Sequence, residues 1–223
     1  KEQFDDLEQQ HEAANFGMWI FLATEVMFFG GLFAGYTIFR NLYPADFAAG
    51  SHLLHVKFGA TNTAVLICSS LTMALAVRAA QTGKRRQLIF FLAATLILGL
   101  AFLGIKLTQE WGPDLREGFV PGLDFSGAAG KLAELTRLGE LQGYSSLPHV
   151  ELFMVFYFFM TGVHALHMVI GAGILGILLV GAWKGKFGPD SFNAIEMSGL
   201  YWHFVDVIWI FLFPLLYLLG GRY

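Results

Sequence analysis

A long apolar stretch near the start of the chain, Phe16 to Phe39, reads FGMWIFLATEVMFFGGLFAGYTIF. It is long enough to cross a bilayer as a helix, because the hydrocarbon core takes roughly 20 apolar residues. Its one charged residue, Glu25, would lie about 14 Å from Phe16 along that helix, near the middle of the hydrocarbon. We therefore expect Glu25 to be protonated, hydrogen-bonded, or beside a water-filled space. It is either an acid satisfied by a neighbouring helix or a site linked to protons or lipid, and an acid inside a membrane favours the second interpretation.

The composition is that of a membrane protein. The 223 residues are 56% hydrophobic and 14% charged, with a mean hydropathy of +0.58. Soluble domains carry about 25% charged residues. The apolar residues fall in long blocks, which indicates an all-α, polytopic bundle. A net charge of −3 without a basic tract gives no indication of nucleic-acid binding. The single cysteine, Cys68, can form no internal disulfide and has no metal-binding spacing around it.

The hydropathy pattern predicts five transmembrane helices in a single domain over residues 16–223. The expected helices cover residues 16–39, 58–79, 87–108, 150–182 and 196–219, with a polar segment at 1–15 and a long outer loop at 109–148. The acidic start is unlike a signal peptide, which has a basic beginning and an apolar centre. Small polar residues in the second helix suit contact between helices. Pro214 should kink the last helix or be absorbed near its end.

Two features of the long loop carry structural expectations. The sequence from Trp111 to Asp114, WGPD, is typical of a helix stop followed by a turn. The segment from Gly130 to Gln142, GKLAELTRLGELQ, is suited to a short amphipathic turn or helix on the membrane surface. We therefore expect the third span to end near residue 108 and the next segment to be mainly irregular.

The basic residues predict an orientation. The link between the second and third helices holds Lys84, Arg85 and Arg86, and the link between the last two holds Lys184 and Lys186. Short loops rich in Lys and Arg face the cytoplasm. This pattern favours an N-terminus inside and a C-terminus outside.

Two histidines, His164 and His167, are three residues apart in the fourth helix and so share one face. Haem ligation, a proton relay and hydrogen-bonded packing all use such residues. One helix cannot supply both axial ligands of one haem, because these approach from opposite sides. His203 is the other histidine in a predicted span. We favour polar packing for these residues, and leave open a role in organising lipid or water.

The last helix contains the run EMSGLYWHFVDVIWIFLF from Glu196 to Phe213. His203 and Asp206 are three apart and are expected to pair on one face, which would let Asp206 be buried. Trp202, near the start of the helix, suits the aromatic belt at the membrane interface. We interpret the pair as structural.

A glycine-rich match to a dinucleotide fingerprint, Gly171-Ala-Gly173-Ile-Leu-Gly176, lies inside an apolar run. It follows no strand and lacks the acid expected downstream, so we interpret it as small residues that allow close helix packing. The extramembrane segments contain no Ser/His/Asp arrangement, zinc spacing or phosphate loop. We therefore assign the chain no catalytic or metal-ligating residue.

The run YWHFVDVIW, Tyr201 to Trp209, resembles the signature of subunit III of haem–copper terminal oxidases, and Glu196 stands seven residues before His203 as in that family. Further segments agree in the same order along the chain: Gly17-Met18 with Thr24–Phe29, Asn62–Leu66, and Thr161–Gly171. The resemblance runs from Phe16 to Gly220 and is weakest at the N-terminus and in the long loop.

This resemblance implies a non-redox subunit that packs beside subunit I, which holds the haem and copper, and beside other oxidase subunits in a bacterial cytoplasmic membrane. The chain is similar to the five-helix form, which lacks the first two helices of longer members. Glu25 matches the family's carbodiimide-reactive acid near the proton inlet of subunit I. The resemblance thus implies that the chain supports proton uptake and protects the catalytic core.

Further implications concern lipid and the electron donor. Bound phospholipid is expected, with Lys184, Lys186 and Trp202 as its contacts. Glu196, His164, His167, His203 and Asp206 are assigned to polar packing inside the membrane. A glutamate at position 25 favours a cytochrome c oxidase, since quinol oxidases of this type tend to have a shorter acid there. A quinol oxidase is the alternative, and membership of a larger respiratory supercomplex is left open.

Two interpretations from other classes compete. A small transporter or channel would use the ionisable residues inside the membrane, but the chain shows no internal repeat and no pair of broken helices. Flux through liposomes containing the chain alone would support it. A haem-binding electron carrier would give the isolated chain a Soret band.

Overall fold

In a computed structural model of the chain, the structure describes residues 7–141, 143–189 and 191–218, and this part is helical with no strand beyond one isolated bridge between Val120 and Asp124. The elements are α1 (Leu7–Leu42), α2 (Pro44–His52), α3 (Val56–Gln81), α4 (Arg85–Ile105), η1 (Lys106–Trp111), α5 (Gly112–Arg116), α6 (Ser126–Arg137), α7 (Leu147–Trp183), α8 (Asn193–Phe213) and η2 (Pro214–Leu218), where η marks a π-helical turn. Among these residues, five helical segments are long and apolar enough to cross a membrane. The predicted all-α fold with five spans is confirmed.

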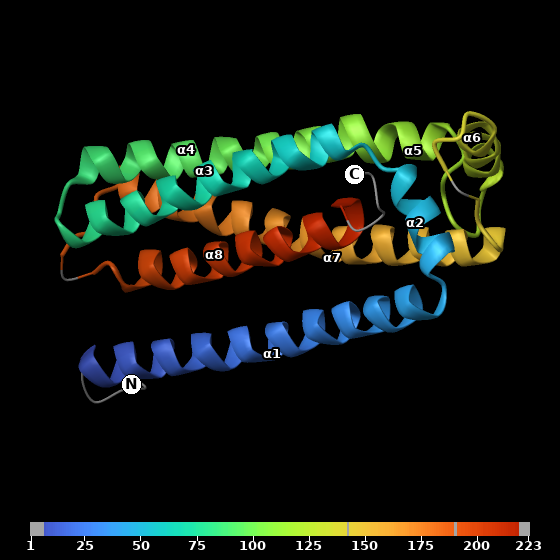
Figure 1. The fold of residues 1–223 in the computed structure, drawn as a ribbon. Coiled ribbons are helices and arrows are strands. Elements are labelled where there is room, and N and C mark those ends of the chain that lie inside the picture. Colours follow the sequence, from blue (N-terminus) through green and yellow to red (C-terminus); the bar gives the residue numbers. More distant parts are fainter. Residues whose placement is uncertain (1–6, 142, 190, 219–223) are drawn as a thin grey trace.

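Four of the long helices form a bundle, and the fifth lies beside it. Helix α3 packs on α4 and α8, and α7 packs on α4 and α8, which closes a ring of four (Figure 1). Helix α1 touches α7 and α8 along one side of this ring, and most of its apolar surface is exposed. The core therefore sits inside the four-helix ring, and α1 presents a free apolar face.

Small residues allow the helices of the ring to approach closely. The Thr72 and Thr95 hydroxyls, on α3 and α4, are 2.8 Å apart and hydrogen-bonded. The Trp202 ring of α8 lies against Gly99 and Gly171, where an added Cβ would come within 2.7 Å and 2.9 Å of it. Any side chain at these two glycines would displace the ring. The predicted role of the small residues of the α3 span in helix contact is consistent with this packing, because Ser69 is fully buried.

The first helix is longer than predicted. Residues 7–15 continue the helix of α1, whereas the sequence suggested a separate polar segment ending at residue 15. The run of Glu, Gln, His and Ala contains no proline or glycine before Gly17, so the helix extends out of the apolar region into water. Residues 1–6, also part of that predicted segment, lie outside the described residues. The other spans begin two or three residues earlier than predicted, close to the usual uncertainty of helix ends.

The predicted loop at 109–148 is largely helical. Helix α4 passes without a break into η1 and α5, so the WGPD sequence does not stop the helix. Pro113 follows directly after the π-helical turn η1, whose changed hydrogen-bond pattern accommodates its missing N–H. The amphipathic segment forms α6, which buries Ala128 and Leu132. Gln142, the predicted end of that segment, lies outside the described residues.

Pro214 is absorbed at the end of the last span. Helix α8 changes there into the wider turn η2, which removes the need for the hydrogen bond that proline cannot donate. The Tyr36 hydroxyl of α1 donates to the Leu215 carbonyl over 2.9 Å. This contact ties α1 to the end of the ring.

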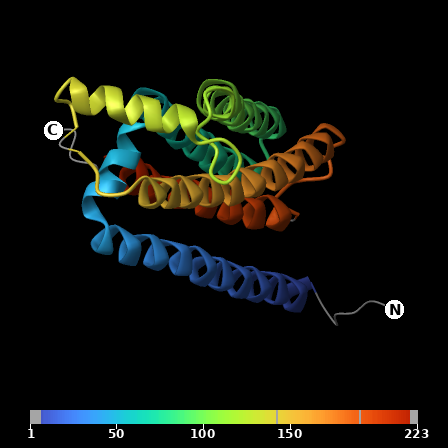
Figure 2. The same ribbon diagram turned by 90° about the vertical axis from the view of Figure 1, so that its right-hand side faces the viewer.

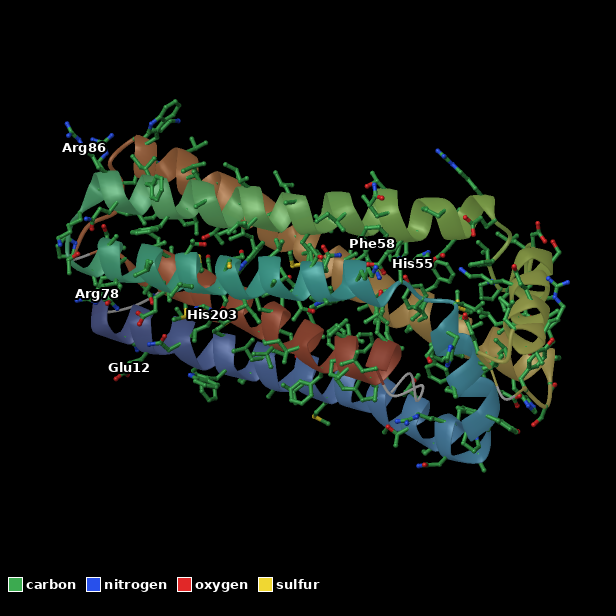
Figure 3. The ribbon with its side chains drawn as sticks, turned by 45° about the horizontal axis from the view of Figure 1, so that its top comes forward. Glu12, His55, Phe58, Arg78, Arg86 and His203 are labelled. Atoms are coloured by element: carbon green, nitrogen blue, oxygen red, sulfur yellow. The ribbon has the colours of Figure 1, made fainter. Side chains whose placement is uncertain are left out.

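The two ends of the bundle differ. At one end, here called the basic end, lie the α3–α4 and α7–α8 links, with Arg78 and Arg86 marked in Figure 3. At the other end, here called the α6 end, α2 and α6 lie across the ends of the long helices (Figures 1 and 2). The two ends therefore differ in structure: short links between helices form the basic end, and two short helices cover the α6 end.

Candidate functional site

Glu25 has a partner on this chain. Its Oε2 lies 3.2 Å from Nε2 of His167, so the contact joins α1 to α7. The two side chains are 20% and 14% exposed, which places the pair at the edge of the bundle rather than in its core. The Tyr201 hydroxyl of α8 donates to the His167 carbonyl over 3.0 Å. Three helices thus meet at this pair.

The hydrogen bonds of His167 determine what the pair can do. Its Nδ1 lies 2.9 Å from the Val163 carbonyl, which can only accept, so Nδ1 carries a proton. Nε2 is then the ring nitrogen that faces the Glu25 carboxyl. A neutral acid can donate to a neutral imidazole, or an imidazolium can donate to a carboxylate. The arrangement is therefore able to hold one proton between an acid and a base at the partly exposed edge of the bundle.

His164 does not act with His167. Three residues turn a helix by about 300°, so the two side chains diverge by about 60°. His164 is 1% exposed and lies in the ring core, 5.2 Å from Trp209 and 5.5 Å from Phe102 between ring centroids. Neither of its nitrogens has a hydrogen-bond partner among the described residues. The two histidines are neighbours on α7, but His164 is packed among aromatic rings in the core, whereas His167 lies at the edge beside Glu25.

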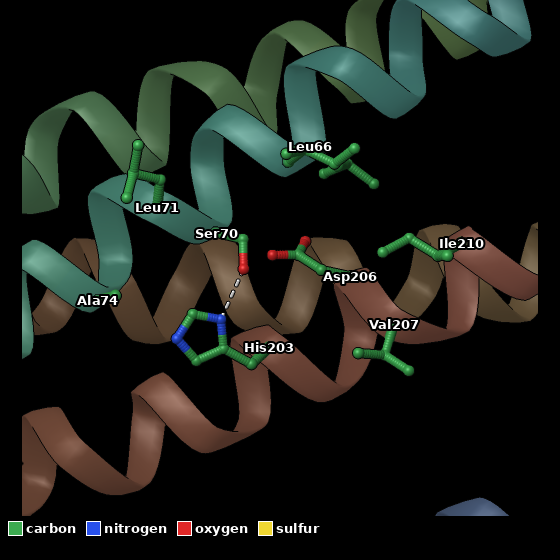
Figure 4. A pocket seen from close by; sticks show the side chains of 9 residues that line it. Leu66, Ser70, Leu71, Ala74, His203, Asp206, Val207 and Ile210 are labelled. Carbon is green, nitrogen blue, oxygen red and sulfur yellow. Dashed lines mark hydrogen bonds between the residues drawn. The ribbon is translucent and has the colours of Figure 1, made fainter.

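His203 and Asp206 lie together but do not form the predicted direct pair. Nδ1 of His203 is 2.7 Å from the Ser70 hydroxyl of α3, and this hydroxyl stands between the two side chains (Figure 4). Asp206 is 3% exposed, and its oxygens form no well-defined hydrogen bond within the described residues. His203 and Asp206 are about one helical turn apart along α8, and Ser70 of α3 lies between the ends of their side chains. They line a pocket of about 350 Å³ between α3 and α8.

Trp202 is not at the surface. It is 1% exposed, and its Nε1 donates to the Ser69 hydroxyl over 3.0 Å. Its expected contact with lipid is therefore wrong, because the residue points into the ring between Gly99 and Gly171. The place of Trp202 in the sequence did not indicate that its side chain points into the ring. Glu196 lies in the first turn of α8, where a carboxylate is favoured by the helix dipole.

Lys184 and Lys186 are exposed at the end of α7 and rim a groove of about 530 Å³. Its floor includes Gly173 and Gly176, above which there is open space, and Ile177 and Val180 belong to its apolar walls. Only Gly171 of the glycine row allows a close approach, to the Trp202 ring of α8. A groove with apolar walls and two ammonium groups at one end suits an acyl chain and an anionic headgroup.

A buried ionic cluster lies near the α6 end of the ring. The Lys106 ammonium lies 2.6 Å from Glu110 Oε2, 3.0 Å from the Tyr157 hydroxyl and 2.7 Å from the Tyr217 hydroxyl. Both tyrosine hydroxyls also donate to Glu110 Oε2. The lysine and the glutamate are 1% and 2% exposed, respectively. The positive charge is thus paired and fully hydrogen-bonded away from water and lipid.

The sequence matches a known protein family. Residues 149–221, from α7 to the end of the last span, match the family model described as cytochrome c oxidase subunit III. Cytochrome c oxidase subunit 3 of Corynebacterium diphtheriae is 31% identical over 203 residues, which cover 90% of this chain and 85% of that protein. The chain belongs to the subunit III family of haem–copper oxidases.

Other relatives of this subunit III are named for quinol. Quinol oxidase subunit 3 of Bacillus spizizenii is 30% identical over 92% of this chain and 86% of that protein. Cytochrome bo(3) ubiquinol oxidase subunit 3 of Pseudomonas aeruginosa is 26% identical over 97% of this chain and 91% of that protein. The chain is therefore a membrane subunit of an oxidase complex, and these relatives are bacterial.

Subunit III holds further contacts that the sequence did not indicate. The acid Asp46 of α2 accepts from the Ser145 and Ser146 backbone N–H groups over 2.5 Å and 3.1 Å, and lies 2.9 Å from Nδ1 of His149. It thereby caps the start of α7 from a distant part of the chain. Among the described residues, no group of three or more His, Cys, Asp or Glu is placed to hold a metal ion.

The loop between α5 and α6 also holds a local acid. Asp124 accepts hydrogen bonds from the Ser126 hydroxyl and backbone N–H over 2.7 Å and 3.1 Å. These bonds stabilise the carboxylate and lower the pKa of Asp124. The contact begins α6 and is local to the loop, so we assign it a structural role.

Proposed function

We propose that this chain is the non-redox subunit III of a proton-pumping terminal oxidase, where it supports proton uptake by subunit I. The observation that carries the proposal is the Glu25–His167 pair, an acid and a base 3.2 Å apart that join two membrane-spanning helices. Haem and copper in subunit I would supply the oxygen chemistry. The role of this chain is to hold an exchangeable proton, and the water around it, beside that subunit.

The exposed face of α1 supports contact with another protein or with lipid. Large apolar side chains cover its outer surface, among them Trp19, Val26, Met27, Phe28 and Ile38. Val26, Met27 and Phe28 follow Glu25 directly, so whatever covers this face also lies close to the pair. If subunit I covers this face of α1, the Glu25–His167 pair would lie close to the proton inlet of subunit I.

The groove rimmed by Lys184 and Lys186 supports lipid binding at the basic end. A phospholipid there would place its phosphate at the ammonium groups and its acyl chain over Gly173 and Gly176. Short, basic links face the cytoplasm, so we place the basic end and the N-terminus inside a bacterial cytoplasmic membrane and the C-terminus outside. Loss of anionic lipid after Lys184→Gln with Lys186→Gln, detected by mass spectrometry of the complex, would test the groove.

For the electron donor, we infer cytochrome c. The glutamate at position 25 and the 31% identical relative support this inference. Quinol is the second candidate, supported by the names of the Bacillus and Pseudomonas relatives. Steady-state oxidation of reduced cytochrome c and of ubiquinol by the same purified complex would decide between them.

The function itself is tested by Glu25→Gln in the complete oxidase. We expect turnover to inactivate the variant severalfold faster than the wild type at equal initial activity, with unchanged haem spectra, since the redox centres lie elsewhere. Thr24→Ser, one residue away, is the matched control. Wild-type inactivation kinetics in Glu25→Gln would refute the role of the pair, and a lost haem signal would refute the non-redox assignment.

A further inference from the structure

A third pocket lies at the α6 end, far along the chain from Lys184 and Lys186. It measures about 520 Å³ and is formed where α2 passes into α3, with α6 above it. Its lining combines two lysines and two histidines with apolar residues: His52, Leu53, Leu54, His55, Val56, Lys57, Phe58 and Lys131. His55 and Phe58 lie together at the start of α3 (Figure 3), with ring centroids 5.9 Å apart. None of the described residues that line it is acidic.

The length of α3 places this pocket at headgroup level. The helix has 26 residues and is therefore about 39 Å long, against a hydrocarbon core of about 30 Å. Its two ends extend beyond the hydrocarbon by several ångströms each. Residues 55–58 occupy one of these ends, and Arg78 with Gln81 occupies the other. The pocket therefore opens at the membrane–water boundary opposite the basic end.

The charges in the pocket come from separate elements that are held in place. Lys57 is exposed on the first turn of α3, where the positive end of the helix dipole adds to its charge. Lys131 comes from α6, and its ammonium lies 5.2 Å from the centroid of the Phe119 ring. Lys131 interacts electrostatically with the acid Asp114. Asp114 is 3% exposed and does not line the pocket. The accessible lining is thus basic.

We propose that this pocket binds the headgroup of an anionic phospholipid in the leaflet at the α6 end. The phosphate would lie between Lys57 and Lys131, and the acyl chains would leave along the apolar start of α3. A soluble anion would make no use of Phe58 and Val56, whereas a lipid would cover them. The site is independent of the groove at Lys184 and Lys186, because the two open into opposite leaflets.

The test uses the complete oxidase in phosphatidylcholine nanodiscs with a small fraction of phosphatidylglycerol that carries a photoreactive headgroup. Peptide mapping should find crosslinks within residues 52–58 and near Lys131. In Lys57→Gln with Lys131→Gln, we expect the crosslink yield to fall about 25-fold, since each basic residue at a membrane surface contributes roughly fivefold. The pair Lys57→Arg with Lys131→Arg should retain it.

A matched control removes the same charge from the same end. Arg116 and Arg137 are exposed and lie outside the pocket, so Arg116→Gln with Arg137→Gln should leave the yield unchanged. The haem content per copy of this chain reports assembly. If the glutamine variant does not assemble, the wild-type crosslink map and the crosslink yield of Lys57→Arg with Lys131→Arg test the proposal instead.

Several results would overturn the proposal. Absence of wild-type crosslinks in these peptides would exclude the site. Equal labelling by a phosphatidylcholine probe would show that charge does not select the ligand. Displacement of the lipid probe by inorganic phosphate would identify a site for free anions instead. Crosslinks near Lys184 and Lys186 report on the other groove and leave this test unaffected.

Discussion

Two acid–base pairs inside the apolar part of the chain lie in opposite surroundings. Lys106 and Glu110 are enclosed by the ring, and two tyrosine hydroxyls complete the hydrogen bonds of the Lys106 ammonium. Glu25 and His167 sit at the edge between α1 and α7, each partly exposed. The enclosed pair is shielded from water, so we assign it a structural role. The edge pair is partly exposed, and this exposure is the basis of the role that we propose for it in proton uptake.

A third pair lies between these extremes. Asp46 is 2% exposed, but its partner His149 is 33% exposed, and the acid also accepts from two backbone N–H groups. The acids of the first and third pairs are equally buried, at 2% exposed, whereas Glu25 is 20% exposed. The edge pair differs from both because neither of its members is fully buried. We expect stability effects to follow the burial of the acid.

The largest effect should come from Lys106→Met. It removes the partner of a buried carboxylate, which costs about 3–5 kcal/mol. Thermal dissociation of this chain from the solubilised oxidase would measure the loss. In Lys106→Met with Glu110→Leu, most of the stability should return, since both charges are gone. Arg137→Met is the exposed control. Wild-type stability of the single variant would contradict the enclosed nature of the cluster.

A smaller loss is expected for Asp46→Ala. The change removes the acceptor of two backbone N–H groups at the start of α7 and should cost about 2 kcal/mol. Asp46→Asn should lose less, because one amide oxygen can still accept. Hydrogen exchange at residues 145–149 would detect the loosened turn. Unchanged protection there in the alanine variant would show that Asp46 is not a cap.

The smallest stability effect should come from Glu25→Gln. The amide that this change introduces can still hydrogen-bond His167, so the variant should lose less than about 1 kcal/mol and remain assembled at nearly wild-type stability. The same thermal dissociation measurement applies, with Thr24→Ser as control. A loss as large as that of Lys106→Met would place Glu25 among the structural groups and remove the contrast between the two pairs.

The fold could be predicted from the sequence alone because the spans are long and uniformly apolar. It also identified Glu25, since a charge in such a run is conspicuous. It could not identify His167 as the partner, because that contact depends on how α1 lies against α7. It placed Trp202 in the aromatic belt at the membrane interface, whereas the residue lies inside the ring against Gly99 and Gly171, since aromatic residues occur both in cores and at interfaces.

The enclosed cluster was missed for a different reason. The sequence after Lys106 carries polar residues and the WGPD run, which together indicate the end of a helix. A wider π-helical turn instead carries Lys106 and Glu110 inward, and a second such turn carries Tyr217 toward them. Such turns have no strong sequence signal, although they are frequent at functional sites.

The contrast between the pairs is tested most directly by time-resolved proton uptake of the complete oxidase during a single turnover. We predict that Glu25→Gln and His167→Gln each slow uptake severalfold, whereas Lys106→Met with Glu110→Leu takes up protons at the wild-type rate. Wild-type uptake in Glu25→Gln, or slowed uptake only in the Lys106 and Glu110 double variant, would contradict the account.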